Sequence, residues 1–175
     1  PQDRVQRVAA YVQSRGMACS VYGAQFLLDA LYLAGRDEAA LRLMAGKGLR
    51  SWYNMLRMGS TITTEAWDNV YKSNLDWNHA WGAAAANVIA RRLMGIRPLK
   101  PGFEEIAICP QPGGLPHARI VQPSPRGSIG VEWRTRRDGK LNLSVTVPAN
   151  STARLTLPHT GQVVTLPPGH HRISE

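Results

Sequence analysis

The sequence predicts an α+β chain with a helical first half and a small antiparallel β-sandwich at its carboxyl end. Between residues 21 and 46, apolar residues recur at three- and four-residue spacing, which is typical of amphipathic helices. From residue 127 onward, apolar and polar residues alternate, which is typical of strands with one buried face. A segment rich in proline and glycine separates the two patterns. We therefore expect helices over 1–97, a connection over 98–126 and the sandwich over 127–175.

The first part of the chain has a pattern of short helices. Four are expected, over residues 3–14, 21–34, 37–46 and 51–59. The second is apolar nearly all round, which indicates burial on two sides. Gly35 is a suitable stop for this helix, and Asp37 is a suitable N-cap for the next. The two helices are therefore expected to form a tight helical hairpin.

The strongest helical pattern of the chain begins at Asn78, as the N-cap, and ends at Gly95. Its first half consists almost entirely of small residues around Trp81, and such residues let a neighbouring helix or a ligand approach the backbone closely. The segment before it is expected to be a loop. Thr63 and Thr64 are β-branched, and their hydroxyl groups compete for backbone hydrogen bonds.

Period-two alternation is clearest in two segments joined by a turn at Asp138-Gly139. Strands are expected at residues 103–109, 129–133, 141–147, 153–157, 163–166 and 171–174. Trp133 alternates with smaller apolar residues, so we expect it in the core of the sandwich. Residues 110–125 contain five of the twelve prolines and are expected to form a crossing segment.

Charge and cysteine content restrict the function classes. The net charge is +9, which raises the question of nucleic-acid binding. The basic excess is split between the two ends, however, and residues 61–110 contain five basic and five acidic side chains. This distribution argues against a single nucleic-acid-binding stripe. Cys19 and Cys109 are isolated, so neither a disulfide framework nor a cysteine metal site is expected.

A second exclusion concerns membranes. No apolar run approaches the ~18 residues that span a bilayer, and no charged-then-apolar leader precedes Tyr11. We therefore expect no membrane association.

Residues 60–82 form the segment whose composition suits chemistry. Aromatic side chains, among them Trp67, Trp77 and Trp81, are interleaved with carboxylates, amides and hydroxyls. A sugar stacks its C–H faces on aromatic rings, and its hydroxyl groups need hydrogen-bond partners. A carboxyl group in such a place is also the usual tool of glycosidic hydrolysis. Structural roles are the alternative, because tryptophans at this spacing are more often core residues.

The carboxylates of this segment are Glu65, Asp68 and Asp76. Composition alone leaves open which of them is catalytic, since most carboxylates are solvated surface groups or local caps. His79 could equally be a residue at the start of a helix. Metal binding by His79 is not expected, because no second histidine or cysteine lies at a suitable spacing.

Three motifs occur in order: Thr-Ile-Thr-Thr-Glu-Ala-Trp-Asp at 61–68, Asn-His-Ala-Trp-Gly-Ala at 78–83, and Gly-Ile-Arg-Pro-Leu-Lys-Pro-Gly-Phe at 95–103. This combination resembles the carboxyl end of bacterial α-L-rhamnosidases of glycoside hydrolase family 78. The helical hairpin upstream, with Tyr22-Gly23, and the strands downstream, with Leu157-Pro158, fit the same family. The resemblance therefore covers most of the chain.

That family has an (α/α)6 barrel as its catalytic domain, flanked by β-sandwich domains. It hydrolyses terminal α-L-rhamnose from glycosides with inversion and requires no cofactor. The resemblance implies that this chain holds the last helical hairpins of the barrel and the closing sandwich. The missing N-terminal part of the same enzyme and a rhamnose-containing glycoside or polysaccharide are then its partners, with no role for nucleic acid or membrane.

The resemblance also assigns roles to residues. It implies that Glu65 is the general base and that His79 and Trp67 face the sugar pocket, with Trp81 and Trp77 as further substrate-binding residues. The general acid lies in earlier barrel segments, so the 175-residue chain alone is expected to be inactive.

Two other function classes remain as alternatives. One is a non-catalytic carbohydrate-binding or structural module, in which the aromatic segment binds sugar and no water is activated. The other is a basic nucleic-acid-binding domain, which would show steeply salt-dependent binding.

Overall fold

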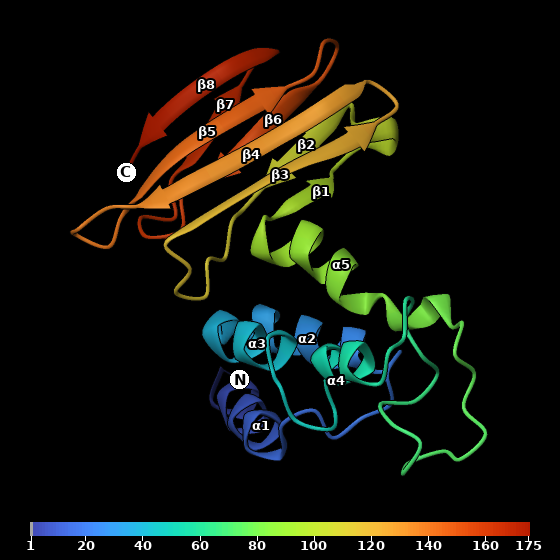
Figure 1. The fold of residues 1–175 in the computed structure, drawn as a ribbon. Coiled ribbons are helices and arrows are strands. Elements are labelled where there is room, and N and C mark those ends of the chain that lie inside the picture. Colours follow the sequence, from blue (N-terminus) through green and yellow to red (C-terminus); the bar gives the residue numbers. More distant parts are fainter. Residues whose placement is uncertain (1) are drawn as a thin grey trace. The chain divides into compact units, whose positions relative to one another are not determined.

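The computed structural model describes residues 2–175, which divide into a helical unit that ends at Val88 and a β unit that begins at Ile89 (Figure 1). The α+β class predicted from the sequence is confirmed. The division between the units falls before residue 97, because the segment that follows Val88 packs with the strands rather than with the helices.

The helical unit contains the four short helices that the sequence predicts. They are α1 (Gln2–Arg15), α2 (Ala24–Leu33), α3 (Asp37–Met44) and α4 (Trp52–Arg57). Helix α2 is the centre of this unit, since it contacts α1 and α3 and buries Leu28 and Leu31 completely. Gly35 ends α2 with a φ of 69°, a left-handed conformation that glycine adopts without strain.

The cap of α3 differs from the prediction and the cap of α4 was not predicted. Asp37 is the first residue of α3, and the cap position is held by Arg36 without a side-chain hydrogen bond. Helix α4 begins with a side-chain cap, because Ser51 Oγ accepts a hydrogen bond from the Asn54 amide at 3.1 Å.

The long helix predicted from Asn78 is broken into shorter pieces. His79 has an extended backbone, a 3-10 turn η1 follows (Ala80–Gly82), then α5 (Ala84–Val88) and a π-helical turn η2 (Ile89–Leu93). Two hydrogen bonds between His79 and Thr63 hold this start in the extended conformation. A Cβ at Gly82 would lie 2.6 Å from Thr63 Cβ, so the loop packs against the backbone at the glycine.

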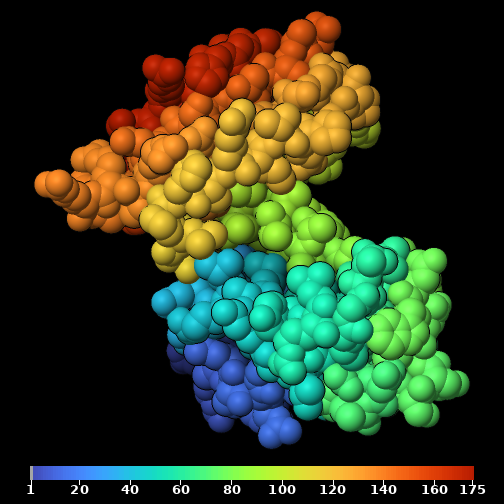
Figure 2. Space-filling model, viewed as in Figure 1, coloured from blue at the N-terminus to red at the C-terminus, as the bar shows by residue number. Residues whose placement is uncertain are grey.

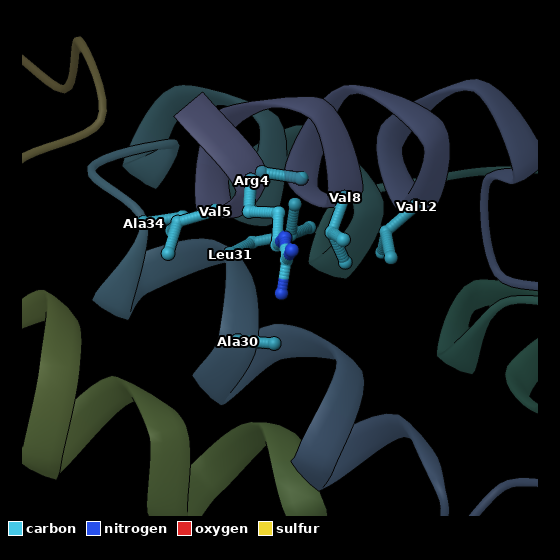
Figure 3. Close-up of a pocket in the computed structure, with 8 residues that line it drawn as sticks. Arg4, Val5, Val8, Val12, Ala30, Leu31 and Ala34 are labelled. Atoms are coloured by element: carbon cyan, nitrogen blue, oxygen red, sulfur yellow. The ribbon is translucent and has the colours of Figure 1, made fainter. Parts of the chain in front are cut away.

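An apolar groove lies between α1 and α2 (Figure 3). Its volume is about 290 Å³, and Val5, Val8 and Val12 of α1 point into it from one side while Ala30 and Ala34 of α2 line the other. Val8 is 60% exposed. Helix α1 therefore leaves part of the apolar face that it turns toward α2 exposed to solvent. Exposed apolar surface of this kind often marks a contact with another part of a protein.

The β unit has two four-stranded sheets (Figure 1). The first has the order β1-β2-β6-β7 and the second has the order β3-β4-β5-β8. The strands are β1 (Ile96–Pro98), β2 (Glu105–Ile108), β3 (His117–Ser124), β4 (Gly127–Thr135), β5 (Leu141–Val147), β6 (Thr152–Thr156), β7 (Val163–Leu166) and β8 (Gly169–Ser174), with a 3-10 turn η3 (Pro101–Phe103) after β1. Strands β2 and β6 pair in parallel, and the other pairs are antiparallel.

The predicted alternation places one side of the two central strands, β4 and β5, in the core. Trp133 is completely buried, as the sequence predicts, and Ile129 and Val131 share its side of β4. Residues 98–126, expected to be a connection, supply β2 and β3 to the sheets. Strand β3 was not predicted, because the five prolines of residues 110–125, among them Pro123, indicated a crossing segment. Strand β3 lies at the edge of its sheet, where proline is tolerated.

Residues 2–175 contain neither a candidate membrane-spanning helix nor a candidate metal-binding cluster. No helix in this range is both long and apolar enough to cross a membrane. The same residues include no group of three or more histidine, cysteine or acidic side chains arranged to hold a metal ion.

Candidate functional site

Two parts of the segment 60–82 pair side by side in the helical unit. The Glu65 amide donates to the Asp76 carbonyl at 2.9 Å, and the His79 amide donates to the Thr63 carbonyl at 2.8 Å. Thr63 Oγ1 completes the pairing by donating to the His79 carbonyl at 2.7 Å. These hydrogen bonds place the backbone of residues 63–65 beside that of residues 76–79. The segment lies on the surface of the helical unit, as Figure 2 shows in green.

The Glu65 carboxylate is held by one partner on each oxygen. Lys72 Nζ donates to Oε1 at 2.5 Å, and the Asp76 amide donates to Oε2 at 3.1 Å. These hydrogen bonds, that of Lys72 first, hold the pKa of Glu65 below its usual range, although partial desolvation acts in the opposite direction. The side chain is 28% exposed. Glu65 is therefore an ionised acceptor at neutral pH, and each oxygen keeps a lone pair for a further donor.

A hollow of about 430 Å³ opens beside this carboxylate, within the size range of small-molecule sites. Its lining includes Glu65, Trp67, Tyr22, Arg50, Tyr71 and Lys72. The Arg50 guanidinium lies over the Tyr71 ring at 4.7 Å from its centroid. Sequence reasoning did not predict Arg50, Tyr71 or Lys72, because residues in a loop show no periodicity that would mark them.

Trp67 is both a core residue and a wall of this hollow. Its side chain is 3% exposed, and its indole N–H donates to the Cys19 carbonyl at 2.7 Å. The ring packs edge-to-face against Trp52 with centroids 5.0 Å apart. Because the side chain is almost fully buried, little of the ring is available to a ligand. Cys19 also lines the hollow, and burial raises the pKa of its thiol, which disfavours the reactive thiolate.

Trp81 and His79 extend the site along the surface. Trp81 is 72% exposed, and its ring meets those of Tyr22 and His79 edge-to-face, at centroid distances of 6.2 and 5.8 Å. Tyr22 also lines the hollow, so this exposed aromatic row continues from it. Trp77 is 43% exposed and belongs neither to the described lining of the hollow nor to the row.

The other two carboxylates of the segment have local structural partners. Asp68 accepts from the Asn54 side chain at 2.7 Å and from the Val70 amide at 3.1 Å, and the bond from Asn54 is the main cause that lowers its pKa. Asp76 is 59% exposed, and its Oδ1 accepts from the Asn78 amide at 2.9 Å. Of the three carboxylates, Glu65 is the one that lines the hollow.

Two family models match the chain, one for each unit. The bacterial α-L-rhamnosidase six-hairpin glycosidase domain matches residues 2–93, and the bacterial α-L-rhamnosidase C-terminal domain matches residues 95–171. Together they cover both the helices and the sandwich.

Individual α-L-rhamnosidases are similar to this chain in sequence and in fold. One from Alteromonas sp. is 31% identical over 160 residues, which are 86% of this chain and 16% of that protein. One from Streptomyces avermitilis is 28% identical over 87% of this chain and 16% of that protein. The chain therefore spans about one sixth of the length of these curated relatives.

Among solved structures, native α-L-rhamnosidase from Aspergillus terreus superposes with a TM-score of 0.87 at 22% identity, over 99% of this chain and 21% of that chain. The Streptomyces avermitilis enzyme in complex with L-rhamnose gives 0.82 at 23% identity, over 99% of this chain and 20% of that one. These two establish the fold.

A family 78 rhamnosidase from Bacillus sp. GL1 gives a TM-score of 0.67 at 27% identity, over 86% of this chain and 17% of that chain. The six-hairpin match precedes the C-terminal match along the sequence, as the order of helices and strands requires. The chain belongs to the bacterial α-L-rhamnosidase family and corresponds to the carboxyl-terminal part of a glycoside hydrolase family 78 enzyme.

Proposed function

We propose that this chain is the carboxyl-terminal part of an inverting α-L-rhamnosidase and that Glu65 is its general base. The observation on which the proposal rests is the Glu65 carboxylate, kept ionised by Lys72 and the Asp76 amide beside a hollow with aromatic walls. An ionised carboxylate at the edge of a sugar-sized hollow can accept a proton from water. This is the task of the base in an inverting glycosidase.

In the proposed reaction, water is held between Glu65 and the anomeric carbon of rhamnose. Glu65 removes a proton as the water oxygen bonds to that carbon from the face opposite the leaving group. The glycosidic C–O bond breaks, and a carboxylic acid ~6.5–9.5 Å away gives its proton to the leaving oxygen. The products are free rhamnose of inverted configuration and the aglycone alcohol.

The general acid is proposed to come from an upstream part of the same enzyme. The chain spans 16% of its curated relatives, and Asp68 and Asp76 have local partners, so neither is well placed as the acid. The exposed apolar groove between α1 and α2 supports the same proposal, because upstream barrel helices would cover it (Figure 3). The 175-residue chain alone is then inactive on an aryl rhamnoside.

Sugar recognition is proposed to involve the wall beside Glu65. The C–H face and the methyl group of rhamnose can pack on the exposed rings of Trp81 and Tyr22. His79 Nδ1 lies 3.9 Å from Asp76 Oδ2, so its ring can present the other nitrogen to a sugar hydroxyl or to the attacking water. Trp67 supports this wall from behind, and Trp77 is a more peripheral member of the proposed site.

The test is Glu65→Gln in the full-length protein that contains this chain, with an aryl α-L-rhamnoside as substrate. We expect kcat to fall by about 10²–10⁴, the usual contribution of general acid–base catalysis. We expect KM to change little, since the amide keeps the shape of the side chain. Glu38→Gln is the matched control, because Glu38 is an exposed residue of α3 paired with Arg42. An unchanged kcat in Glu65→Gln would remove the base role.

The exposed aromatic row favours one other function, a non-catalytic sugar-binding module. In that case the full-length protein would bind rhamnose through Trp81 and Tyr22 but would show no hydrolysis before or after the Glu65→Gln change. Product stereochemistry followed by NMR separates the mechanisms: release of β-L-rhamnose first is expected for inversion.

A further inference from the structure

The outer face of the β3-β4-β5-β8 sheet has an unusual set of side chains. Strand register places two rows across it, His117–Arg134–Asn142–Ser174 and Arg119–Glu132–Ser144–Arg172. All eight are polar or charged, and Arg119 and Arg134 are each 68% exposed. Three guanidinium groups therefore share one sheet face with a single carboxylate, Glu132.

The charges on this face are not balanced. Glu132 contacts His117 at 3.0 Å, Arg134 at 3.5 Å and Arg119 at 4.0 Å. None of the ion pairs found within residues 2–175 includes Arg172. Even with His117 neutral, the three guanidinium groups outnumber the one carboxylate of these two rows, so the face keeps an excess of positive charge.

The neighbouring β1-β2-β6-β7 sheet shows the contrast. There Arg154 of β6 pairs with Glu105 of β2 at 3.9 Å, and in the connection between β1 and β2 Lys100 pairs with Glu104 at 3.4 Å. An ordinary solvated surface has charged side chains of both signs mixed together. A face that gathers arginines around one carboxylate differs from such a surface and suits an anionic ligand.

The face is also hollowed between its arginines. The lining of a depression of about 440 Å³ includes the polar residues Glu132, Arg134, Asn142, Ser144, Arg172 and Ser174. Strands β4 and β8 are separated by β5, so their side chains stand about 10 Å apart. The short side chains of β5, Ser144 and Asn142, form the floor between these two walls. One guanidinium stands on each wall.

The chemistry of the lining fits a charged sugar. A guanidinium fork binds a carboxylate with two parallel hydrogen bonds. Asn142 Oδ1 accepts from Ser174 Oγ at 2.9 Å, so the Asn142 side-chain N–H groups can donate to a ligand. Glu132 can accept a hydrogen bond from a hydroxyl group, and His117 and the arginines keep its pKa below the usual range. The two rows contain no phenylalanine, tyrosine or tryptophan, so a neutral sugar that needs stacking fits less well.

We propose that this face binds a carboxylate-bearing sugar unit of an acidic oligosaccharide, with the carboxylate between Arg134 and Arg172. That the acid belongs to a saccharide rests on the proposed function. Glu132 on the same wall can accept a hydrogen bond from a sugar hydroxyl group, and the phosphodiester backbone of DNA has no such donor. The site is separate from Glu65 and would hold a polysaccharide while its rhamnose branches are hydrolysed.

The test uses the full-length protein that contains this chain and a fluorescent tetragalacturonate as the probe. We expect binding that weakens as NaCl rises, and a loss of about tenfold or more in affinity for Arg134→Ala and for Arg172→Ala, because each removes a charge-assisted hydrogen bond. Arg154→Ala is the matched control, an exposed arginine on the other sheet, and its affinity is expected to match that of the unmodified protein.

Three results would overturn the proposal. One is equal affinity of the unmodified protein and the double variant of Arg134 and Arg172, with circular dichroism showing that both are folded. Another is equal binding of a carboxyl-reduced, neutral tetrasaccharide. The third is tighter binding of duplex DNA than of the probe. Glu65→Gln separates this site from the catalytic one, because it should lower hydrolysis and leave probe binding unchanged.

Discussion

Trp67 offers a test of which tryptophans support the fold and which belong to the proposed sugar site. Trp67→Phe removes two buried ring carbons, worth about 1.6 kcal/mol at ~0.8 kcal/mol per carbon. It also removes the hydrogen bond to the Cys19 carbonyl, worth about 1 kcal/mol. We therefore expect the free energy of unfolding of the helical unit to fall by about 2.5 kcal/mol. For a urea m-value near 2 kcal/mol/M, the midpoint moves by about 1 M.

Tryptophan fluorescence suits this measurement, since Trp133 is the one tryptophan of the chain that lies in the β unit. Urea titration of the 175-residue chain therefore reports mainly on the helical unit. Trp77→Phe is the control, because Trp77 is half-exposed and its change should cost less than about 0.5 kcal/mol. Steady-state kinetics of the full-length protein complete the test. An unchanged midpoint for Trp67→Phe with a large rise in KM would refute the assignment of Trp67 to the core.

Two further predictions concern Glu65 and the β unit. Lys72→Met removes the hydrogen bond that lowers the pKa of Glu65, so this pKa should rise. The acidic limb of the kcat/KM–pH profile should then move to higher pH. An unmoved limb would show that Lys72 does not control the ionisation of the proposed base. Gly95→Ala would place its Cβ 2.1 Å from the Cys109 carbonyl at a φ of 75°, and should cost the β unit at least ~3 kcal/mol in denaturant unfolding. Gly139→Ala is the control, because Gly139 has a similar φ but open space around it, and this change should cost about 1 kcal/mol. Equal losses of unfolding free energy in the two variants would show that the structure relieves the clash at residue 95.

The sequence predicted elements whose pattern is periodic and local. Strands β4 and β5 alternate so regularly that burial follows the predicted faces, and Gly35 ends α2 as its position indicates. The broken helix after Asn78 was not predictable in this way. Its cause is a tertiary contact, the pairing of His79 with Thr63, and local helix propensity has no information about it. Strand β3 was not predicted for a related reason. A strand tolerates proline at the edge of a sheet, and the sequence pattern does not show which strands lie at an edge.

The candidate site was predictable in part. The resemblance implied Glu65, and the structure places that residue at a hollow together with Trp67. Burial of Trp67 depends on Trp52 and Cys19, which come from other elements, so composition could not distinguish a core ring from a sugar platform. Lys72 and Arg50 follow no spacing rule, because the loop that positions them has an irregular backbone.

The surroundings of Glu65 bear on which of two carboxyl groups is the base. An inverting glycosidase needs one carboxyl group protonated and the other ionised at the same pH, and proteins achieve this by giving the two groups different environments. Lys72 and the Asp76 amide both stabilise the ionised form of Glu65. A carboxylate in this setting has its proton removed too readily to serve as the acid. In the proposed mechanism the acid therefore comes from a more apolar or more negatively charged position, and the described carboxylates of this segment do not supply one.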